Sequence, residues 1–388
     1  MQLNQYYTED MYGDILVSNL SLPSPKIALD LGFGTGNLLH AAKRRWNNLS
    51  LIGVDIDKDH ITHAKAHTAI AAIEHNGFDP SLPDRILDRF GEIDLLLGNP
   101  PFFSSSLDQK SKMILQASGM LDCISKQTKK IPAELIFIAQ NLRLLSKEGE
   151  LGLIVPAGII SGERWKPIRE FLFSNYTISN VIQLPTDSFK NTDAQTFILT
   201  IKHKLEKING ITLSHINNTE SLKIKPEEAF IRADYDYYQK TLDMGTALNI
   251  TLNDFQLYRG NKSHNILDNI AKKHLHTTTM PKLPIKQSFN NTSLDGAKNT
   301  LSGDILISRV GRRCLGRAIY VERGSVPISD CIIGIRPRTK NAGNLIWKKL
   351  SSPSCKDYFS RVSLGVGAKY ITYKTITDYL TSNDHAAT

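Results

Sequence analysis

Apolar residues in the first two thirds of the chain gather in short runs, each long enough for one strand. Such runs occupy residues 26–31, 50–54, 93–97, 150–155, 177–184 and 195–201. Longer stretches between them carry apolar residues at the spacing of a helix, at 37–46, 133–146 and 164–173. Near-continuous apolar runs are typical of strands buried on both faces. The alternation therefore predicts an α/β fold with a doubly wound, mainly parallel sheet.

The pattern changes at about residue 245. The remainder offers a helical stretch at 264–274, strands within 302–311, 318–321 and 328–335, and a second helical stretch from 344. Short strands are prominent here, which indicates a smaller, β-rich α+β domain. We therefore predict two domains, residues 1–245 and 246–388, and the length of 388 residues also favours two.

A glycine-rich turn follows the first predicted strand directly. The strand runs into Gly32-Phe33-Gly34-Thr35-Gly36, and a helix begins after it. In this context glycines let the backbone approach a ligand at a helix N-terminus. The second strand leads to Asp55, 19 residues after Gly36, where an acidic residue typically accepts hydrogen bonds from ribose hydroxyls. A helix cap is the alternative interpretation of Asp55.

The strand at 93–97 leads into Gly98-Asn99-Pro100-Pro101-Phe102. Each proline fixes its own φ and pushes the preceding residue out of the helical region, which predicts a stiff turn. Open α/β sheets bind their ligands at such carboxyl ends of strands. The Asn99 amide oxygen and the Pro100 carbonyl could together hold a planar amino group, and Phe102 offers a face for stacking. The alternative is a proline-rich turn without a chemical role.

The histidines and cysteines do not suggest a metal site. His60, His63 and His67 share one face of a predicted helix, but no carboxylate or cysteine completes a ligand set, so we expect a solvated face and no metal. The four cysteines are scattered, which is typical of reduced cytoplasmic thiols. We expect no signal peptide and no membrane segment, because no apolar run approaches roughly 20 residues.

Charge is distributed unevenly along the chain. The formal net charge is +9, yet residues 251–388 alone carry 21 Lys or Arg and 9 Asp or Glu, or +12, which leaves −3 for the rest. A near-neutral first part and a basic second part favour a polyanionic partner held mainly by the second. A basic surface that serves only solubility is the alternative.

The order of the motifs resembles that of the S-adenosylmethionine-dependent N6-adenine DNA methyltransferases of gamma type, a restriction-modification family. It runs from a segment at Thr8 through the turn from Asp30 to Gly36 and through Asp55 to the turn from Asn99 to Phe102. The resemblance covers residues 5–204. It implies a Rossmann-like sheet and the transfer of a methyl group from S-adenosylmethionine to a flipped adenine in duplex DNA. It therefore implies a site-specific, adenine-specific DNA methyltransferase.

The resemblance also implies roles for single residues. Asn99, Pro100 and Phe102 would be catalytic, with Phe102 and Phe189 against the extruded base. The residues that would bind the cofactor are Thr8, Asp30, Gly32, Gly34, Gly36, Asp55, Asp84 and Asn99. Asp88 rivals Asp84 for the adenine amino group of the cofactor. Glu9 departs from the family pattern, which has proline after the threonine, and this weakens the assignment of Thr8.

The second part resembles the target recognition domains of type I specificity subunits. The segments 303–309 (GDILISR) and 329–333 (SDCII) carry this resemblance. Arginine can read guanine edges, and both basic residue types neutralise phosphates. The candidates for DNA contact, without a choice of which reads bases, are Arg309, Arg312, Arg313, Arg317 and Lys369.

Two other interpretations remain open. Ribosomal RNA guanine-N2 methyltransferases and protein glutamine methyltransferases share Asn-Pro-Pro-aromatic, although they would not be expected to carry a long basic second domain. A non-catalytic DNA-binding specificity protein is the other alternative, which the intact glycines, Asp55 and Asn99 disfavour. The expected partner is double-stranded DNA, with a cognate restriction endonuclease as a further candidate, and we expect a monomer or weak dimer.

Overall fold

The computed structural model describes residues 10–186, 188–189, 194–204, 210–239, 249–270, 273–365 and 368–381. The chain divides into two compact units, Met1–Tyr238 and Gln239–Thr388. The sequence placed this boundary at 245. The first unit ends at α10 (Tyr235–Tyr238), which is tied to the large sheet because the Gln183 amide donates to Asp236 across 2.6 Å and Tyr235 is 1% exposed.

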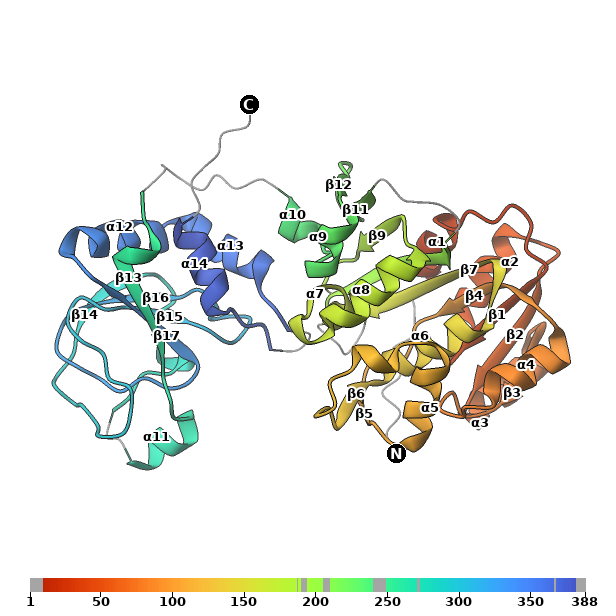
Figure 1. Ribbon diagram of the computed structural model, residues 1–388, viewed down its shortest axis with the longest axis horizontal. Coiled ribbons are helices and arrows are strands. Elements are labelled where there is room, and N and C mark those ends of the chain that lie inside the picture. The colour runs from red at the N-terminus through yellow and green to blue at the C-terminus, as the bar shows by residue number, and fades with distance from the viewer. Residues whose placement is uncertain are drawn as a thin grey trace. The chain divides into compact units, whose positions relative to one another are not determined.

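Unit 1 is built on one large sheet (Figure 1). Within the described residues it has ten strands in the order β12-β11-β9-β10-β7-β4-β1-β2-β3, with β8 paired to β10. Strands β1, β2, β3, β4 and β7 run parallel, whereas β10 is antiparallel to β7 and β9. The predicted doubly wound, mainly parallel sheet is confirmed. The strands are β1 (Ile27–Leu31), β2 (Ser50–Asp55), β3 (Ile70–Glu74), β4 (Ile93–Gly98), β7 (Leu145–Pro156), β8 (Tyr176–Thr177), β9 (Asn180–Gln183), β10 (Thr196–His203), β11 (Ile211–His215) and β12 (Leu222–Ile224).

Helices connect these strands. They are α1 (Asp10–Ser18), α2 (Asn37–Arg45), α3 (Lys58–His67), α4 (Leu82–Phe90), α5 (Gln109–Ala117), α6 (Ala133–Leu144), α7 (Ala157–Ser161), α8 (Lys166–Asn175) and α9 (Pro226–Ile231). A short pair, β5 (Ser104–Ser106) and β6 (Lys130–Pro132), lies outside the large sheet. Strand β3 has no clear signal in the sequence, because the alanines of Ile-Ala-Ala-Ile-Glu favour a helix over a strand.

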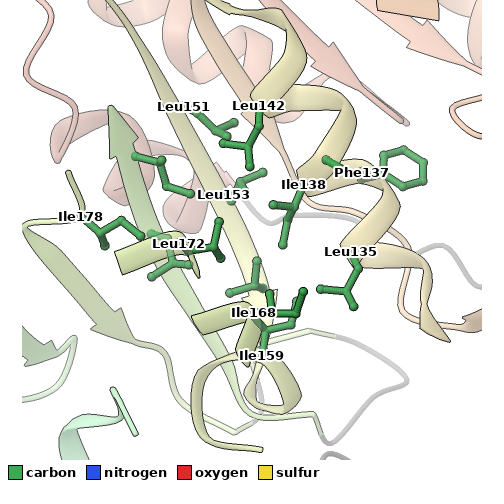
Figure 2. Close-up of a cluster of buried hydrophobic side chains, with 14 of the residues drawn as sticks. Leu135, Phe137, Ile138, Leu142, Leu151, Leu153, Ile159, Ile168, Leu172 and Ile178 are labelled. Atoms are coloured by element: carbon green, nitrogen blue, oxygen red, sulfur yellow. The ribbon is translucent and has the colours of Figure 1, made fainter. Parts of the chain in front are cut away.

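The apolar side chains of the sheet alternate between two cores. Leu96 joins the larger cluster, while its neighbours Leu95 and Leu97 join the other, and all three are fully buried. Figure 2 shows the larger cluster, to which Ile138 of α6 and Leu153 of β7 both belong. A fully buried leucine contributes roughly 1.5–3 kcal/mol, so the two cores fix the strands firmly.

Unit 2 is an α+β unit with a five-stranded sheet in the order β13-β17-β15-β16-β14. All pairs are antiparallel except β14 with β16. The strands are β13 (Phe255–Arg259), β14 (Ile285–Ser288), β15 (Ile305–Ser308), β16 (Ala318–Arg323) and β17 (Ile332–Pro337). The helices are α11 (His264–Ile270), α12 (Lys340–Leu350), α13 (Pro353–Val362) and α14 (Tyr373–Thr381).

One core of unit 2 lies between its sheet and its C-terminal helices. Ile305 and Ile335 from the sheet share a cluster with Ile346 of α12, Phe359 of α13 and Ile376 of α14. All five are fully buried. Among the residues that the structure describes in either unit, no helix has both the length and the apolar character needed to cross a membrane.

Candidate active site

The register of the parallel strands brings the sequence motifs to one edge of the sheet. Asp30 of β1 lies opposite Gly53 of β2 on one side and opposite Leu97 of β4 on the other. The carboxyl ends of these three strands are therefore level. The glycine turn follows β1, Asp55 ends β2, and the turn at Asn99 follows β4, so these groups lie at the same edge of the sheet.

Backbone geometry explains the glycines of the first turn. Gly32, Gly34 and Gly36 have φ values of +82°, +56° and +84°, a region that residues with a Cβ rarely adopt. A Cβ on Gly36 would lie 2.7 Å from Ile70 Cδ1. The turn is also tied to β2, because the Gly32 amide donates to the Val54 carbonyl across 2.7 Å. The result is a rigid backbone turn in front of helix α2.

Asp55 holds that turn together. Its Oδ2 accepts from the Gly34 amide across 2.9 Å, and its Oδ1 accepts from the Asp57 amide across 2.9 Å. His60 approaches the same Oδ2 with its Nδ1 at 3.3 Å. The next residue, Ile56, is 50% exposed at this edge of the sheet, a position that the sequence analysis did not single out. Asp55 thus has a defined orientation, with an exposed apolar side chain beside it.

Asp30 is a buried carboxyl group at the centre of the edge. It is 2% exposed, and its Oδ1 accepts no hydrogen bond from the described residues. Burial raises its pKa well above the ordinary value, and the negative charge of Asp55 raises the pKa further. An ideal Cβ on Gly98 would lie 4.0 Å from this Oδ1, so Asp30 borders the turn that carries Asn99. A cationic group placed there would favour the ionised form of Asp30.

The turn at residues 99–102 is partly enclosed. Pro100 is buried, while Asn99 and Phe102 are half-buried. The following segment is anchored because the Ala133 amide donates to the Phe103 carbonyl across 2.9 Å. Asp30 and Asn99 lie at the ends of the paired strands β1 and β4, and Phe102 keeps part of its surface accessible.

Aromatic side chains that the sequence analysis missed lie beside the glycine turn. A Cβ on Gly32 would meet the Phe137 ring at 3.4 Å, and one on Gly77 would meet it at 2.8 Å. Phe78 packs edge-on against Phe137 with 6.0 Å between ring centroids, and it stacks on Phe103 at 6.1 Å. Phe137 gave no signal in the sequence, because an aromatic residue in a helix normally indicates core packing.

Glu134 is a second buried carboxyl group near this edge. It lies in the first turn of α6, one turn before Phe137, and it is 4% exposed. Its Oε2 accepts no hydrogen bond from the residues that the structure describes. Burial raises the pKa of Glu134 to about 8. This carboxyl group is therefore mostly neutral at pH 7.

Asp84 lies elsewhere than the sequence analysis expects. It is on helix α4 with its side chain 73% exposed, 3.8 Å from the Arg143 guanidinium. Asp88 lies on the same helix. The reason is that β3 ends at Glu74, so the loop at residues 75–79 follows a strand end directly and α4 comes later. In that loop the exposed Asn76 side chain accepts from the Phe78 amide across 2.9 Å.

Phe189 is part of the core. It is 3% exposed and stacks on Tyr12 of α1 with 5.7 Å between ring centroids. A ring so fully covered cannot receive a base, so this conformation does not support the role that the resemblance implies. Thr8 lies outside the described residues.

In unit 2 the structure separates the predicted DNA contacts into two kinds. Arg317 donates to the Met280 carbonyl across 2.9 Å and to the Arg313 carbonyl across 2.8 Å, so its guanidinium holds the backbone in place. Arg312 and Arg313 are exposed. These two residues remain candidates for contact with a polyanion.

Arg309 and Lys369 come together although they are distant in sequence. The Gly311 amide donates to the Lys369 carbonyl across 2.8 Å, and the Arg309 guanidinium lies 5.5 Å from the centroid of Tyr370. Burial lowers the pKa of Arg309, and the charge of Arg259 lowers it further. Arg259 therefore belongs to the same basic group, and the sequence analysis missed it because it lies 50 residues earlier.

A family model described as N-6 DNA Methylase matches residues 2–244, more than half of the chain. A relative from Methanocaldococcus jannaschii, a putative type II restriction enzyme and methyltransferase, is 27% identical over 34% of this chain and 11% of its own length. A type I restriction enzyme methylase subunit from Mycoplasma pneumoniae is 24% identical over 47% of this chain and 36% of its own. The chain thus spans well under half of the length of these two relatives.

A solved structure supports the fold of both units. The type IIG restriction endonuclease BpuSI matches with a TM-score of 0.54 and 15% identity, over 96% of this chain and 58% of that one. At this identity the likeness extends to the fold alone.

Proposed function

Because the chain belongs to the N-6 DNA methylase family, whose cofactor is S-adenosylmethionine, we propose that it methylates the N6 amino group of adenine in double-stranded DNA. The observation that carries the proposal is the position of Asp30 and Asn99 on adjacent strand ends beside the glycine turn. This arrangement can hold a cationic nucleoside and a planar amino group side by side.

The residues at this edge fit S-adenosylmethionine. The buried Asp30 carboxyl group, whose Oδ1 accepts no hydrogen bond within the described part of the chain, suits the positive charge of its methionine portion. The turn from Gly32 to Gly36 offers close approach to the backbone. Asp55 is oriented to accept from the ribose of the cofactor, and the exposed Ile56 offers apolar surface for the adenine ring of the cofactor.

When bound, S-adenosylmethionine supplies an electrophilic methyl group. The lone pair of the adenine amine is delocalised into its ring, so this nitrogen is a weak nucleophile. The Asn99 side-chain oxygen and the Pro100 carbonyl would accept both N–H groups and localise the lone pair on the nitrogen. The methylated amine is acidic and loses its proton afterwards, so no strong base has to act first. Catalysis would come from positioning and from fixed dipoles in a closed site.

A paired base cannot reach this turn, so the target adenine must leave the duplex at a cost of a few kcal/mol. Stacking on an aromatic ring recovers about 1–3 kcal/mol. Phe102, which is half-buried next to Asn99, is the ring that we assign to this contact. Phe103, the next residue along the chain, is 36% exposed and is the second candidate for stacking on the extruded base.

Unit 2 would be the target recognition domain. The net charge of +12 over residues 251–388 suits a duplex, and Arg309 with Arg259 forms a basic group at the end of two of its strands. A restriction-modification role like that of the archaeal and bacterial relatives would place the protein in the cytoplasm, where the DNA of such cells lies. A cognate restriction endonuclease is a further partner that the restriction-modification relatives suggest.

The test is to incubate the purified protein with S-adenosylmethionine and unmethylated duplex DNA, digest the DNA, and measure N6-methyladenine by mass spectrometry. We expect N6-methyladenine with the wild-type chain and none with Asn99→Ala. The proposal fails if DNA remains unmethylated while the cofactor binds and added restriction-modification subunits do not change the result. Methylation of transfer RNA or ribosomal RNA in the same assay would redirect the substrate assignment.

A further inference from the structure

Three histidines and an aspartate gather in unit 2. His264 and Asp268 lie one turn apart on α11, and His274 follows that helix. One ligand atom from each of these three residues lies within 4.8 Å of the others. His276 completes the group, since its ring stacks on that of His264 with 4.3 Å between centroids and an angle of 11°.

The rings of His264 and His274 face each other through one nitrogen each. His264 Nδ1 lies 2.8 Å from His274 Nε2. Two imidazole nitrogens at this distance require one donor and one acceptor, so the pair cannot carry a proton on each of these nitrogens. A tetrahedral zinc ion with Zn–N bonds of about 2.0–2.1 Å needs roughly 3.3 Å between two such nitrogens. An adjustment of about half an ångström, with the bridging proton moved to the other nitrogen of the ring that carries it, would therefore free both nitrogens for a metal ion.

The surrounding contacts hold the ligands in place. The segment that carries His274 is anchored because the Leu275 amide donates to the Pro327 carbonyl and the Ser329 amide donates to the Leu275 carbonyl, each across 2.9 Å. His276 Nδ1 lies 2.8 Å from the Ser329 hydroxyl. Leu267, between the two ligands on α11, is fully buried. Helix and segment are thus both fixed within unit 2, and the exposed Asp268 side chain lies beside the two imidazoles.

We propose that His264, Asp268 and His274 form a zinc site in unit 2, with one coordination position left for water. Two imidazoles and one carboxylate are a donor set that zinc accepts with an open fourth position. The ion would tie α11 to the segment that pairs with Ile328 and would stabilise the fold of unit 2. Neither the sequence, which predicted no metal, nor the matched family, which covers residues 2–244, assigns this site.

The inference is tested with the full chain, free of an affinity tag and treated with a chelator that is then removed. Zinc chloride is titrated against it by calorimetry. We expect one equivalent to bind with a dissociation constant below about 1 µM, and His264→Ala/His274→Ala to weaken binding by at least about tenfold for each ligand removed. Asp268→Asn should weaken it less, because the amide oxygen keeps one weak donor.

His63→Ala/His67→Ala is the matched control. These two histidines also lie one turn apart on a helix, with 5.0 Å between ring centroids, and they belong to unit 1. The control should bind zinc as the wild-type chain does. Equal zinc affinity in the wild-type chain and in His264→Ala/His274→Ala would overturn the proposal, as would wild-type binding weaker than about 10 µM.

Thermal unfolding provides a second readout that does not depend on activity. Zinc should raise the melting temperature of the wild-type chain and of the control, but not that of His264→Ala/His274→Ala. If the double variant fails to fold, Asp268→Asn replaces it, and an unchanged zinc response in that variant would contradict the site. An equal rise in the wild-type chain, in the control and in His264→Ala/His274→Ala would assign the effect to other residues, such as the cysteines, and refute the proposal.

Discussion

The two units hold their candidate binding groups in different ways. In unit 1 the groups sit on adjacent ends of buried parallel strands, so Asp30 and Asn99 are fixed by register and by backbone contacts. In unit 2 the basic residues lie at or beyond strand ends, and some are exposed while Arg317 donates to backbone carbonyl groups. A site of the first kind should depend on single atoms. A surface of the second kind should depend on summed charge.

The largest effect should come from Asn99→Ala, which removes the acceptor that positions the amine. We expect methyl transfer to fall by at least about 10³-fold, since a preorganised polar group of this kind is worth about 10²–10³ and its absence also loosens the base. Cofactor affinity should change little. Transfer of radioactive methyl groups and calorimetry measure the two quantities.

Asn175→Ala is the control for this variant, because Asn175 is exposed at the end of α8 and its amide donates only locally, to the Phe171 carbonyl across 2.8 Å. Methyl transfer at the wild-type rate in Asn99→Ala would remove Asn99 from the catalytic role.

Burial of Glu134 should make the free energy of unfolding depend on pH. Its pKa is raised to about 8 in the folded protein, against 4.5 as the ordinary value, so between these pH values the unfolded chain binds fewer protons than the folded one. The stabilisation from the neutral carboxyl group is complete below about pH 4.5 and is lost as the pH rises through 8. By pH 7 the loss should reach about 3 kcal/mol.

Denaturant unfolding between pH 5 and pH 8 measures this dependence. Glu134→Gln should flatten it, because the amide is never charged, whereas Glu148→Gln at an exposed position should leave it unchanged. The same slope in Glu134→Gln and in the wild-type chain would show that another group titrates.

Gly32→Ala tests the close approach in the turn. Its φ of +82° disfavours alanine, and the new Cβ would meet the Phe137 ring at 3.4 Å. An alanine in this conformation carries about 1–3 kcal/mol of backbone strain, and the turn would shift to relieve it. We therefore expect the affinity for S-adenosylmethionine to fall by about tenfold. Isothermal titration measures the affinity.

Gly91→Ala is its matched control, since φ is +74° and no atom lies within 4 Å of the new Cβ. It should lower stability by about 1 kcal/mol and leave cofactor affinity unchanged. Equal losses of cofactor affinity in Gly32→Ala and Gly91→Ala would mean that backbone strain anywhere in unit 1 lowers the affinity. Gly32 would then have no particular role in cofactor binding.

The smallest effect per residue is expected in unit 2. Arg312→Ala/Arg313→Ala should reduce the slope of log affinity for DNA against log salt by about 2, as for two phosphate contacts. Arg85→Ala/Arg89→Ala, an exposed pair on α4 of unit 1, should leave the slope unchanged. Fluorescence anisotropy over a range of salt concentrations measures it. A larger change of this slope in Arg85→Ala/Arg89→Ala than in Arg312→Ala/Arg313→Ala would assign the DNA-binding surface to unit 1.

The sequence by itself determined the elements whose residues are close along the chain. The strand, glycine turn and helix from Ile27 to Arg45 and the turn at Asn99 are local patterns, and the structure forms both where the sequence predicts them. Local preference and burial agree in these segments, which is why a single sequence suffices. The alternation of strand and helix then gave the fold class.

Only the tertiary structure decided what depends on contacts between distant residues. Burial of Phe189 against Tyr12, the raised pKa of Glu134 and the antiparallel direction of β10 all require packing that no local pattern encodes. The histidines of unit 2 show the same limit, because His264 and His274 meet only when the chain returns to pair with Ile328. Burial and electrostatic coupling depend on which residues surround a group in the folded protein, so a local sequence pattern does not contain them.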